Sequence, residues 1–83
     1  MNRSALLFDE AKMPAPVSHV RLPSLRAWRL QRELRQVDLA TTAGVSKPVV
    51  ERAERGQPVR ALSAAKLARA LGVTVAQLES EPQ

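Results

Sequence analysis

The expected fold depends most on residues 36–56, which read QVDLATTAGVSKPVVERAERG. The stretch predicts two short helices, at about 36–43 and from about 47 onward, because Gly44 can adopt the left-handed conformation that ends a helix. Ser46 is the candidate N-cap of the second helix. Pro48 is compatible with its first turn, where the missing N–H would have no intrahelical partner. Two helices joined by a glycine-containing turn are typical of a DNA-reading helix-turn-helix, and equally of a structural helical hairpin.

A further helix is expected on the N-terminal side of this stretch, at about 25–35. Pro23 and Ser24 precede it, and Ser24 is its candidate N-cap. Apolar residues that recur at helical spacing define one face of this helix. The predicted inward face consists of Ala27, Leu30 and Leu34.

Another helix is expected on the C-terminal side, at about 61–71. Gly56 and Pro58 separate it from the helix that begins near residue 47, and Gly72 ends it. Its apolar residues also recur at helical spacing. The predicted inward face consists of Ala64, Leu67, Ala68 and Leu71.

The last helix is expected to be short, at about 75–79. Thr74 and Gln77 have the spacing of a capping box, in which each side chain bonds the backbone of the other residue. Residues 80–83 follow as a tail that is expected to fray.

Together these helices predict an all-α fold, with one five-helix domain at 23–79. Residues 1–22 are expected to form an N-terminal extension that is irregular or binds a partner. The apolar residues are mainly Ala, Leu and Val, with no Ile and no Tyr, a mixture that favours helices over sheets. A chain of 83 residues without Cys has room for one small domain, and it has no disulfide or thiolate metal site. A large multidomain enzyme is not expected.

The net charge of +5 comes from the middle of the chain, since residues 21–60 hold nine Lys and Arg against four Asp and Glu. A basic block between neutral flanks favours a nucleic-acid partner, although a solvated helix face is the alternative. No apolar run approaches the about 20 residues that cross a bilayer. The N-terminus lacks the apolar region of a signal peptide. We therefore expect a cytoplasmic protein that does not bind membranes.

Residues 25–78 also carry an ordered set of short motifs. The set comprises Arg29, Gln36, Leu39-Ala40, Gly44-Val45-Ser46, Glu54-Arg55-Gly56, Ala70-Leu71-Gly72-Val73 and Leu78. In this order the motifs make the chain resemble the Xre or Cro/C1-type repressor domain family. The resemblance implies a compact lambda-repressor-like domain of five helices, whose third helix enters the major groove of double-stranded DNA. The chain departs from the family at Ala53, where a larger aliphatic residue is usual.

The resemblance implies that the residues after Ser46 read base edges. Lys47 can donate to guanine, and Arg52 can do so with two parallel hydrogen bonds. Pro48 and Val49 offer apolar contact to a thymine methyl group. Glu51 can accept from cytosine, or it can be a solvated or arginine-paired residue.

The resemblance also implies positions that hold the DNA backbone and the helices themselves. Gln36 matches a family position that donates to a phosphate, helped by the positive end of its helix. Arg29 and Glu54 match positions that the family commonly joins by an ion pair between its first and third helices. The remaining expected phosphate contacts are Arg35, Ser46, Arg55 and Arg60, and the three arginines could instead be plain surface charge.

The expected function is that of a repressor that binds a palindromic operator as a homodimer. The alternative is the antitoxin of a toxin–antitoxin pair, which would repress its operon with this domain and bind a toxin through another surface, such as residues 1–20. An enzyme is not expected, because the chain has no Cys and its one histidine, His19, has no placed catalytic partner. For the same reason no metal site and no cofactor are expected.

Overall fold

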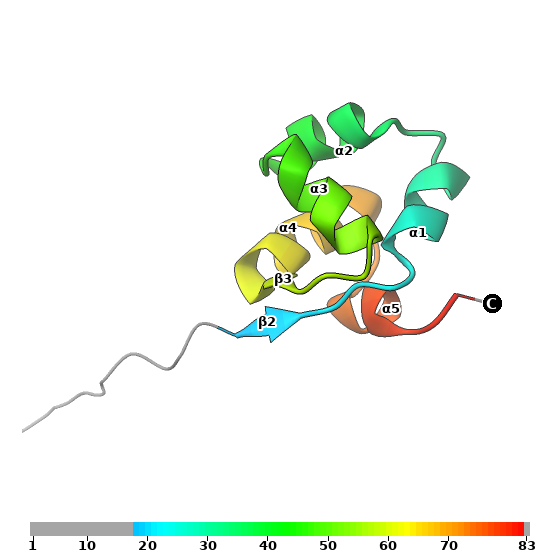
Figure 1. Cartoon of the computed structure of the whole chain (residues 1–83). Helices are drawn as coiled ribbons and strands as arrows, with labels where there is room; N and C mark the ends of the chain where they lie inside the picture. The colour runs from blue at the N-terminus through cyan, green and yellow to red at the C-terminus, as the bar shows by residue number, and fades with distance from the viewer. Residues whose placement is uncertain (1–17, 83) are drawn as a thin grey trace, which may run out of the picture.

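The computed structural model describes residues 18–82, and it confirms the predicted all-α fold of five helices. The helices pack around one core, and a pair of two-residue strands lies at one side (Figure 1). In chain order the elements are β2 (His19–Val20), α1 (Leu25–Gln31), α2 (Gln36–Ala43), α3 (Lys47–Glu54), β3 (Val59–Arg60), α4 (Ala61–Leu71) and α5 (Val75–Glu79).

Glycines end α2 and α4, as the sequence predicts. Gly44 and Gly72 are the C-cap residues, with φ of 76° and 73°. A residue with a Cβ is strained in this left-handed region. The N–H of Gly44 donates to the carbonyl of Ala40, which satisfies one of the last free carbonyls of α2. The turn that leads into α3 therefore begins where the sequence places it.

The starts of α3 and α5 also follow the prediction. Ser46 is the N-cap residue of α3 and a proline lies in the first turn, although the serine side chain makes no capping hydrogen bond. Thr74 and Gln77 form the predicted capping box at α5. The N–H of Gln77 donates to Thr74 Oγ1 at 3.1 Å, and the N–H of Thr74 donates to Gln77 Oε1 at 2.8 Å.

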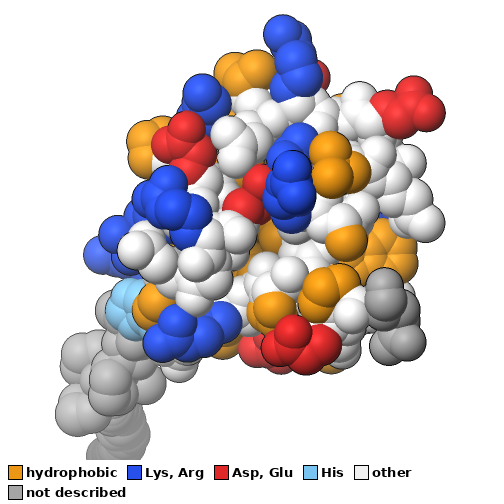
Figure 2. Space-filling view, turned by 45° about the vertical axis from the view of Figure 1, so that its right-hand side comes forward, with side chains coloured by type: hydrophobic (Ala, Val, Ile, Leu, Met, Phe, Trp, Pro, Cys, Tyr) orange, Lys and Arg blue, Asp and Glu red, His pale blue; other side chains and the backbone are white. Residues whose placement is uncertain are grey.

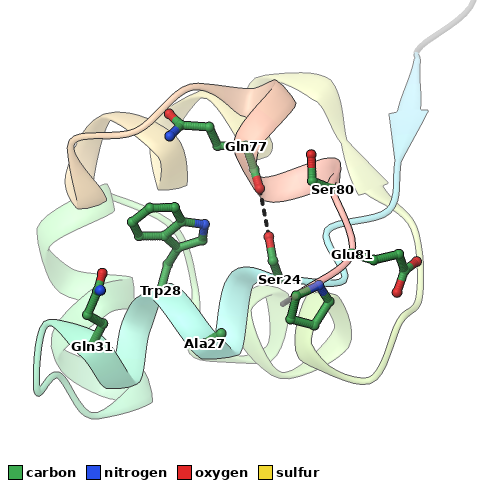
Figure 3. Close-up of a pocket in the computed structure, with 8 residues that line it drawn as sticks. Ser24, Ala27, Trp28, Gln31, Gln77, Ser80 and Glu81 are labelled. Atoms are coloured by element: carbon green, nitrogen blue, oxygen red, sulfur yellow. Dashed lines mark hydrogen bonds between the residues drawn. The ribbon is translucent and has the colours of Figure 1, made fainter.

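The first helix is shorter than predicted, because α1 ends at Gln31 and not near residue 35. Glu33 has a φ of 59°, a left-handed conformation that an α-helix does not continue through. Ser24 lies at the N-cap of α1, but its hydroxyl does not cap the helix. The hydroxyl instead donates to the carbonyl of Gln77 at 2.7 Å and so joins α1 to α5 (Figure 3).

The predicted inward face is confirmed for α4. For the first helix it is wrong at Ala27 and Leu30, whereas Leu34, which lies beyond the end of α1, is partly buried against the core. All four predicted residues of α4 are buried. In α1, Ala27 is exposed and Leu30 is 50% exposed, whereas Leu25 and Arg29 are buried. Arg29 faces inward because a carboxylate of α3 lies there. The buried apolar residues are Leu22, Leu25, Leu39, Ala40, Val50, Ala53, Val59, Ala64, Leu67, Ala68, Leu71 and Leu78.

Residues 18–22 pack on the helical domain, although the sequence assigns them to the extension. β2 pairs antiparallel with β3, and His19 lies opposite Arg60. Leu22 is fully buried in the core. The predictions for residues 1–17, including a toxin-binding segment, lie outside the described residues.

Candidate nucleic-acid interface

Helices α2 and α3 are held in place by their buried faces. α2 buries Leu39 and Ala40, and α3 buries Val50 and Ala53. α2 lies against both α3 and α4. Ala53, where the family usually has a larger residue, is fully buried, so the smaller side chain leaves no opening to solvent. The opposite face of α3 is free to meet a ligand.

A buried ion pair joins α1 to α3. Arg29 Nε donates to Glu54 Oε2 at 2.5 Å, and Arg29 Nη2 donates to Glu54 Oε1 at 2.9 Å. The two side chains are only 9% and 5% exposed. Arg29 Nη1 donates to the carbonyl of Leu34 at 2.8 Å. The hydrogen bond to Glu54 raises the pKa of Arg29, while burial opposes that shift. A two-point contact of this kind fixes orientation as well as distance.

Gln36 bonds the same carboxylate from the first residue of α2. Its Nε2 donates to Glu54 Oε1 at 3.0 Å. Glu54 therefore accepts hydrogen bonds from α1 and from α2, and it ties both helices to the end of α3. An amide nitrogen carries two protons, so one proton of Gln36 Nε2 is still available for another acceptor.

Of the five residues that the resemblance assigns to base reading, four lie on the outward side of α3, whereas Val49 is partly buried against the hydrophobic core. Lys47, Pro48 and Arg52 are exposed. Val49 and Glu51 are partly exposed. Lys47 Nζ lies 3.6 Å from Glu51 Oε2, and both side chains remain open to solvent. Such an exposed pair contributes little stability and exchanges partners readily.

Four of the residues expected at phosphates, Arg35, Ser46, Arg55 and Arg60, are exposed around this face. Arg35 Nε donates to Asp38 Oδ2 at 2.9 Å, and the backbone N–H of Arg35 donates to the same oxygen at 3.1 Å. These two contacts, the side-chain one first, lower the pKa of Asp38. Within the described part of the chain, the side chains of Arg55 and Arg60 have no hydrogen-bond or ion-pair partner. Both are open to an anion.

The sequence does not predict that the segment before α1 supports this face. Arg21 Nη1 donates to the carbonyl of Gly56 at 2.7 Å, directly after α3. Arg52 Nη2 donates to the carbonyl of Pro58 at 3.2 Å in the same loop. No local pattern could show the first contact, because its partners are 35 positions apart. In Figure 2, Lys and Arg side chains are spread over the visible face, and the histidine lies at its lower edge.

Comparison with known proteins agrees with this geometry. A family model described as helix-turn-helix matches residues 25–78, more than half of the chain. The chain belongs to the Xre/Cro-C1-type helix-turn-helix family. A similar solved structure is that of a hypothetical transcription factor, NHTF, from Neisseria. It is 27% identical with a TM-score of 0.67, and the match covers 89% of this chain and 93% of that one. No protein of curated function matches the chain.

The family match spans α2, α3 and the turn between them, and membership in the helix-turn-helix family supports DNA binding. Two further findings concern residues 18–82, which the structure describes. No helix there is long and apolar enough to cross a bilayer. No three His, Cys, Asp or Glu side chains there are grouped so that they could hold a metal ion.

Proposed function

We propose that this helix-turn-helix protein is a transcriptional repressor that binds a palindromic operator as a homodimer. The N-terminal half of α3 enters the major groove, and its exposed and partly exposed residues read the bases. These residues are Lys47, Pro48, Val49, Glu51 and Arg52. The likeness to a structure described as a hypothetical transcription factor supports a role in regulation.

One observation carries the proposal: α3 is rigidly held on its inner side and exposed on its outer side. The buried pair between Arg29 and Glu54 fixes the end of α3 against α1. Val50 and Ala53 fix the same helix against the core. A reading helix needs this combination, because side chains discriminate bases only when their backbone is held at a constant angle.

The backbone contacts proposed for this domain are those of Gln36, Arg35, Ser46, Arg55 and Arg60. Gln36 has a particular role, because the second proton of its amide donates to a phosphate while the first stays on Glu54. A phosphate contact at the start of α2 is thereby linked to the carboxylate that positions α3. Arg35 exchanges Asp38 for a phosphate at small cost, since the pair is exposed.

Two variants separate base reading from backbone contact. Arg52→Ala should weaken binding to a duplex that the protein selects from a random pool by about 1–3 kcal/mol, and it should affect a scrambled duplex much less. Gln36→Ala should weaken both duplexes by a similar factor, because a phosphate carries no base identity. The measurement is fluorescence anisotropy of labelled duplexes. Arg69→Ala is the matched control, because Arg69 is an exposed cation of α4 outside the proposed interface.

If Arg52→Ala and Arg69→Ala bound the selected duplex equally well, α3 would not read bases through Arg52. A wild-type protein whose affinity does not fall as salt rises would contradict the DNA contact as a whole, since each neutralised phosphate releases counterions.

The antitoxin alternative shares the DNA-binding step and adds a toxin-binding surface. The segment named for that surface lies mostly outside the described residues, and no described contact favours it. Deleting residues 1–17 separates the two functions and leaves the pairing of β2 intact. Unchanged operator affinity together with loss of a co-purifying protein would indicate the antitoxin.

A further inference from the structure

A hollow of about 480 Å³ lies between the C-terminal end of α2 and the outward face of α4. Leu62, Lys66 and Arg69 line it from one stripe of α4, because residues three and four positions apart share a face of a helix. Leu62 is 67% exposed, the most exposed large apolar side chain among residues 18–82. The other residues that line the hollow are small: Thr42, Ala43, Gly44, Ala65 and Ala70.

The charges along this stripe are uncompensated. Lys66 and Arg69 are exposed, and neither has a hydrogen-bond or ion-pair partner in the part of the chain that the structure describes. No Asp or Glu is among the described residues that line the hollow. Leu62 lies near the N-terminal end of α4 and the two cations lie nearer its C-terminal end. The hollow therefore suits a ligand that is apolar at one end and acidic at the other.

The chain itself contains a segment with these properties. Residues 5–10 read ALLFDE, so four apolar residues are followed directly by two carboxylates. Asp9 and Glu10 match the two cations in number and are opposite in charge. The apolar part of the segment includes the one Phe of the chain.

The segment is attached close enough to reach the hollow. The N–H of Ala61, the first residue of α4, donates to the carbonyl of Ser18 at 2.9 Å. Strand β2 therefore begins beside the N-terminal end of α4 (Figure 1). The chain from Glu10 to Ser18 can extend over about 25 Å. From Ala61 to Arg69, α4 rises only about 12 Å.

We propose that residues 5–10 bind the hollow between α2 and α4 of the same molecule. The apolar part of the segment covers Leu62, and its two carboxylates pair with Lys66 and Arg69. Each exposed ion pair contributes little by itself, but the covalent attachment gives the segment a high effective concentration at the hollow. The inference goes beyond the proposed function and does not depend on it, because the contact involves no DNA.

The first test locates the segment by nuclear magnetic resonance of the full chain. The chain has no Cys, so the variant Ser4→Cys carries a single nitroxide spin label next to the segment. Comparison of amide spectra with the label oxidised and reduced shows which amides the label approaches. The amides of Thr42, Gly44, Ala65 and Lys66 should be broadened by the oxidised label more than those of α5.

Charge variants of the labelled chain test the ion pairs. Arg69→Glu should lose much of the broadening, because it places a like charge against the two carboxylates. Arg26→Glu, the same change at an exposed arginine of α1, is the matched control and should keep it. Adding Glu10→Arg to Arg69→Glu should restore the broadening, and a merely structural effect of Arg69→Glu would not be reversed in this way.

Apolar variants test the other end of the segment. Leu62→Ala should also lose broadening at the hollow, since it removes the apolar surface that the segment covers. Leu30→Ala is the control, because Leu30 is an apolar residue of α1 that is 50% exposed. Both leucines are exposed, so neither change should unfold the domain.

Three outcomes would overturn the inference. The first is broadening at the hollow that is unchanged in both Arg69→Glu and Leu62→Ala. The second is broadening confined to amides away from the hollow. The third is equal broadening when a spin-labelled chain is mixed with an isotope-labelled chain that carries no spin label, because the segment would then bind a second copy. None of these samples contains DNA, so each outcome leaves the proposed function intact.

Discussion

Glu54 is the residue on which the geometry of the interface most depends. Its carboxylate accepts from Arg29 of α1 and from Gln36 of α2, and it lies at the end of α3. A buried ion pair contributes little net stability compared with a well-packed apolar pair, but removing one partner is costly because a charge is left without compensation. The pair therefore mainly fixes the orientation of α3 relative to α1. Its loss should lower both the stability of the domain and its affinity for DNA.

The first prediction compares this buried carboxylate with an exposed one. Glu54→Ala should lower the free energy of unfolding by about 3–5 kcal/mol, because Arg29 stays buried without its counterion. Glu51→Ala, which removes the exposed partner of Lys47, should change it by less than about 1 kcal/mol. Urea unfolding followed by circular dichroism measures both. Glu54→Gln keeps an acceptor in place and should lie between them. Equal stabilities of the two alanine variants would contradict the assigned role of Glu54.

The second prediction concerns the acid stability that comes from Asp38. Hydrogen bonds from the Arg35 side chain and from its backbone N–H lower the pKa of this carboxyl in the folded protein. Its contribution to stability is therefore fully present above the unfolded pKa of about 3.9, and it is lost as pH falls through the folded pKa. The advantage of wild type over Asp38→Asn should shrink steadily below about pH 4. Unfolding curves at a series of pH values measure it. A constant difference down to the acid limit would contradict the contact.

At the level of helices and strands, local signals in the sequence predict most of the fold. The ends of α2 and α4, the proline at the start of α3 and the capping box at Thr74 each depend on residues within one turn. The end of α1 was not predictable in this way, because Glu33 takes a left-handed conformation without being glycine.

The remaining differences between sequence and structure have tertiary causes. The hydroxyl of Ser24 donates to a carbonyl of α5 and does not cap its own helix. Arg29 faces inward because its guanidinium pairs with the buried carboxylate of Glu54. β2 and β3 pair over only two residues each, and these residues are far apart in the sequence. Strands this short are too short to show an alternating hydrophobic pattern. For the candidate site, the family resemblance placed α3 and its outward residues, whereas the support from Arg21 needed the structure.

The third prediction tests the turn between α2 and α3. An added Cβ at Gly44 would meet no atom within 4 Å, so any cost of Gly44→Ala comes from its φ of 76°. That cost should be about 1–2 kcal/mol of unfolding free energy. Gly44→Asn should cost less, since asparagine tolerates the left-handed region. Thermal or urea unfolding of the two variants decides the matter. If alanine were as stable as glycine here, the turn would not depend on backbone conformation.

At the level of the whole molecule, the charge of +5 is divided among several roles. Arg29 forms a buried ion pair with Glu54 inside the domain, and Arg35 forms an exposed ion pair with Asp38 at the surface. The guanidiniums of Arg55 and Arg60 have no partner in the described structure and are exposed beside α3. These free cations, together with Lys47 and Arg52 of α3, make the face around α3 the one suited to a polyanion.

The most direct test of the central claim is selection of bound sequences from a random pool of duplex DNA by the full-length protein. A homodimer that reads DNA with α3 should enrich a palindrome whose half-sites lie about one helical turn apart. The Arg52→Ala variant should lose base preference at positions related by that symmetry. A pool that stays random after repeated rounds, while the protein remains folded and binds DNA, would contradict sequence-specific recognition. A single asymmetric consensus would contradict the two-fold dimer.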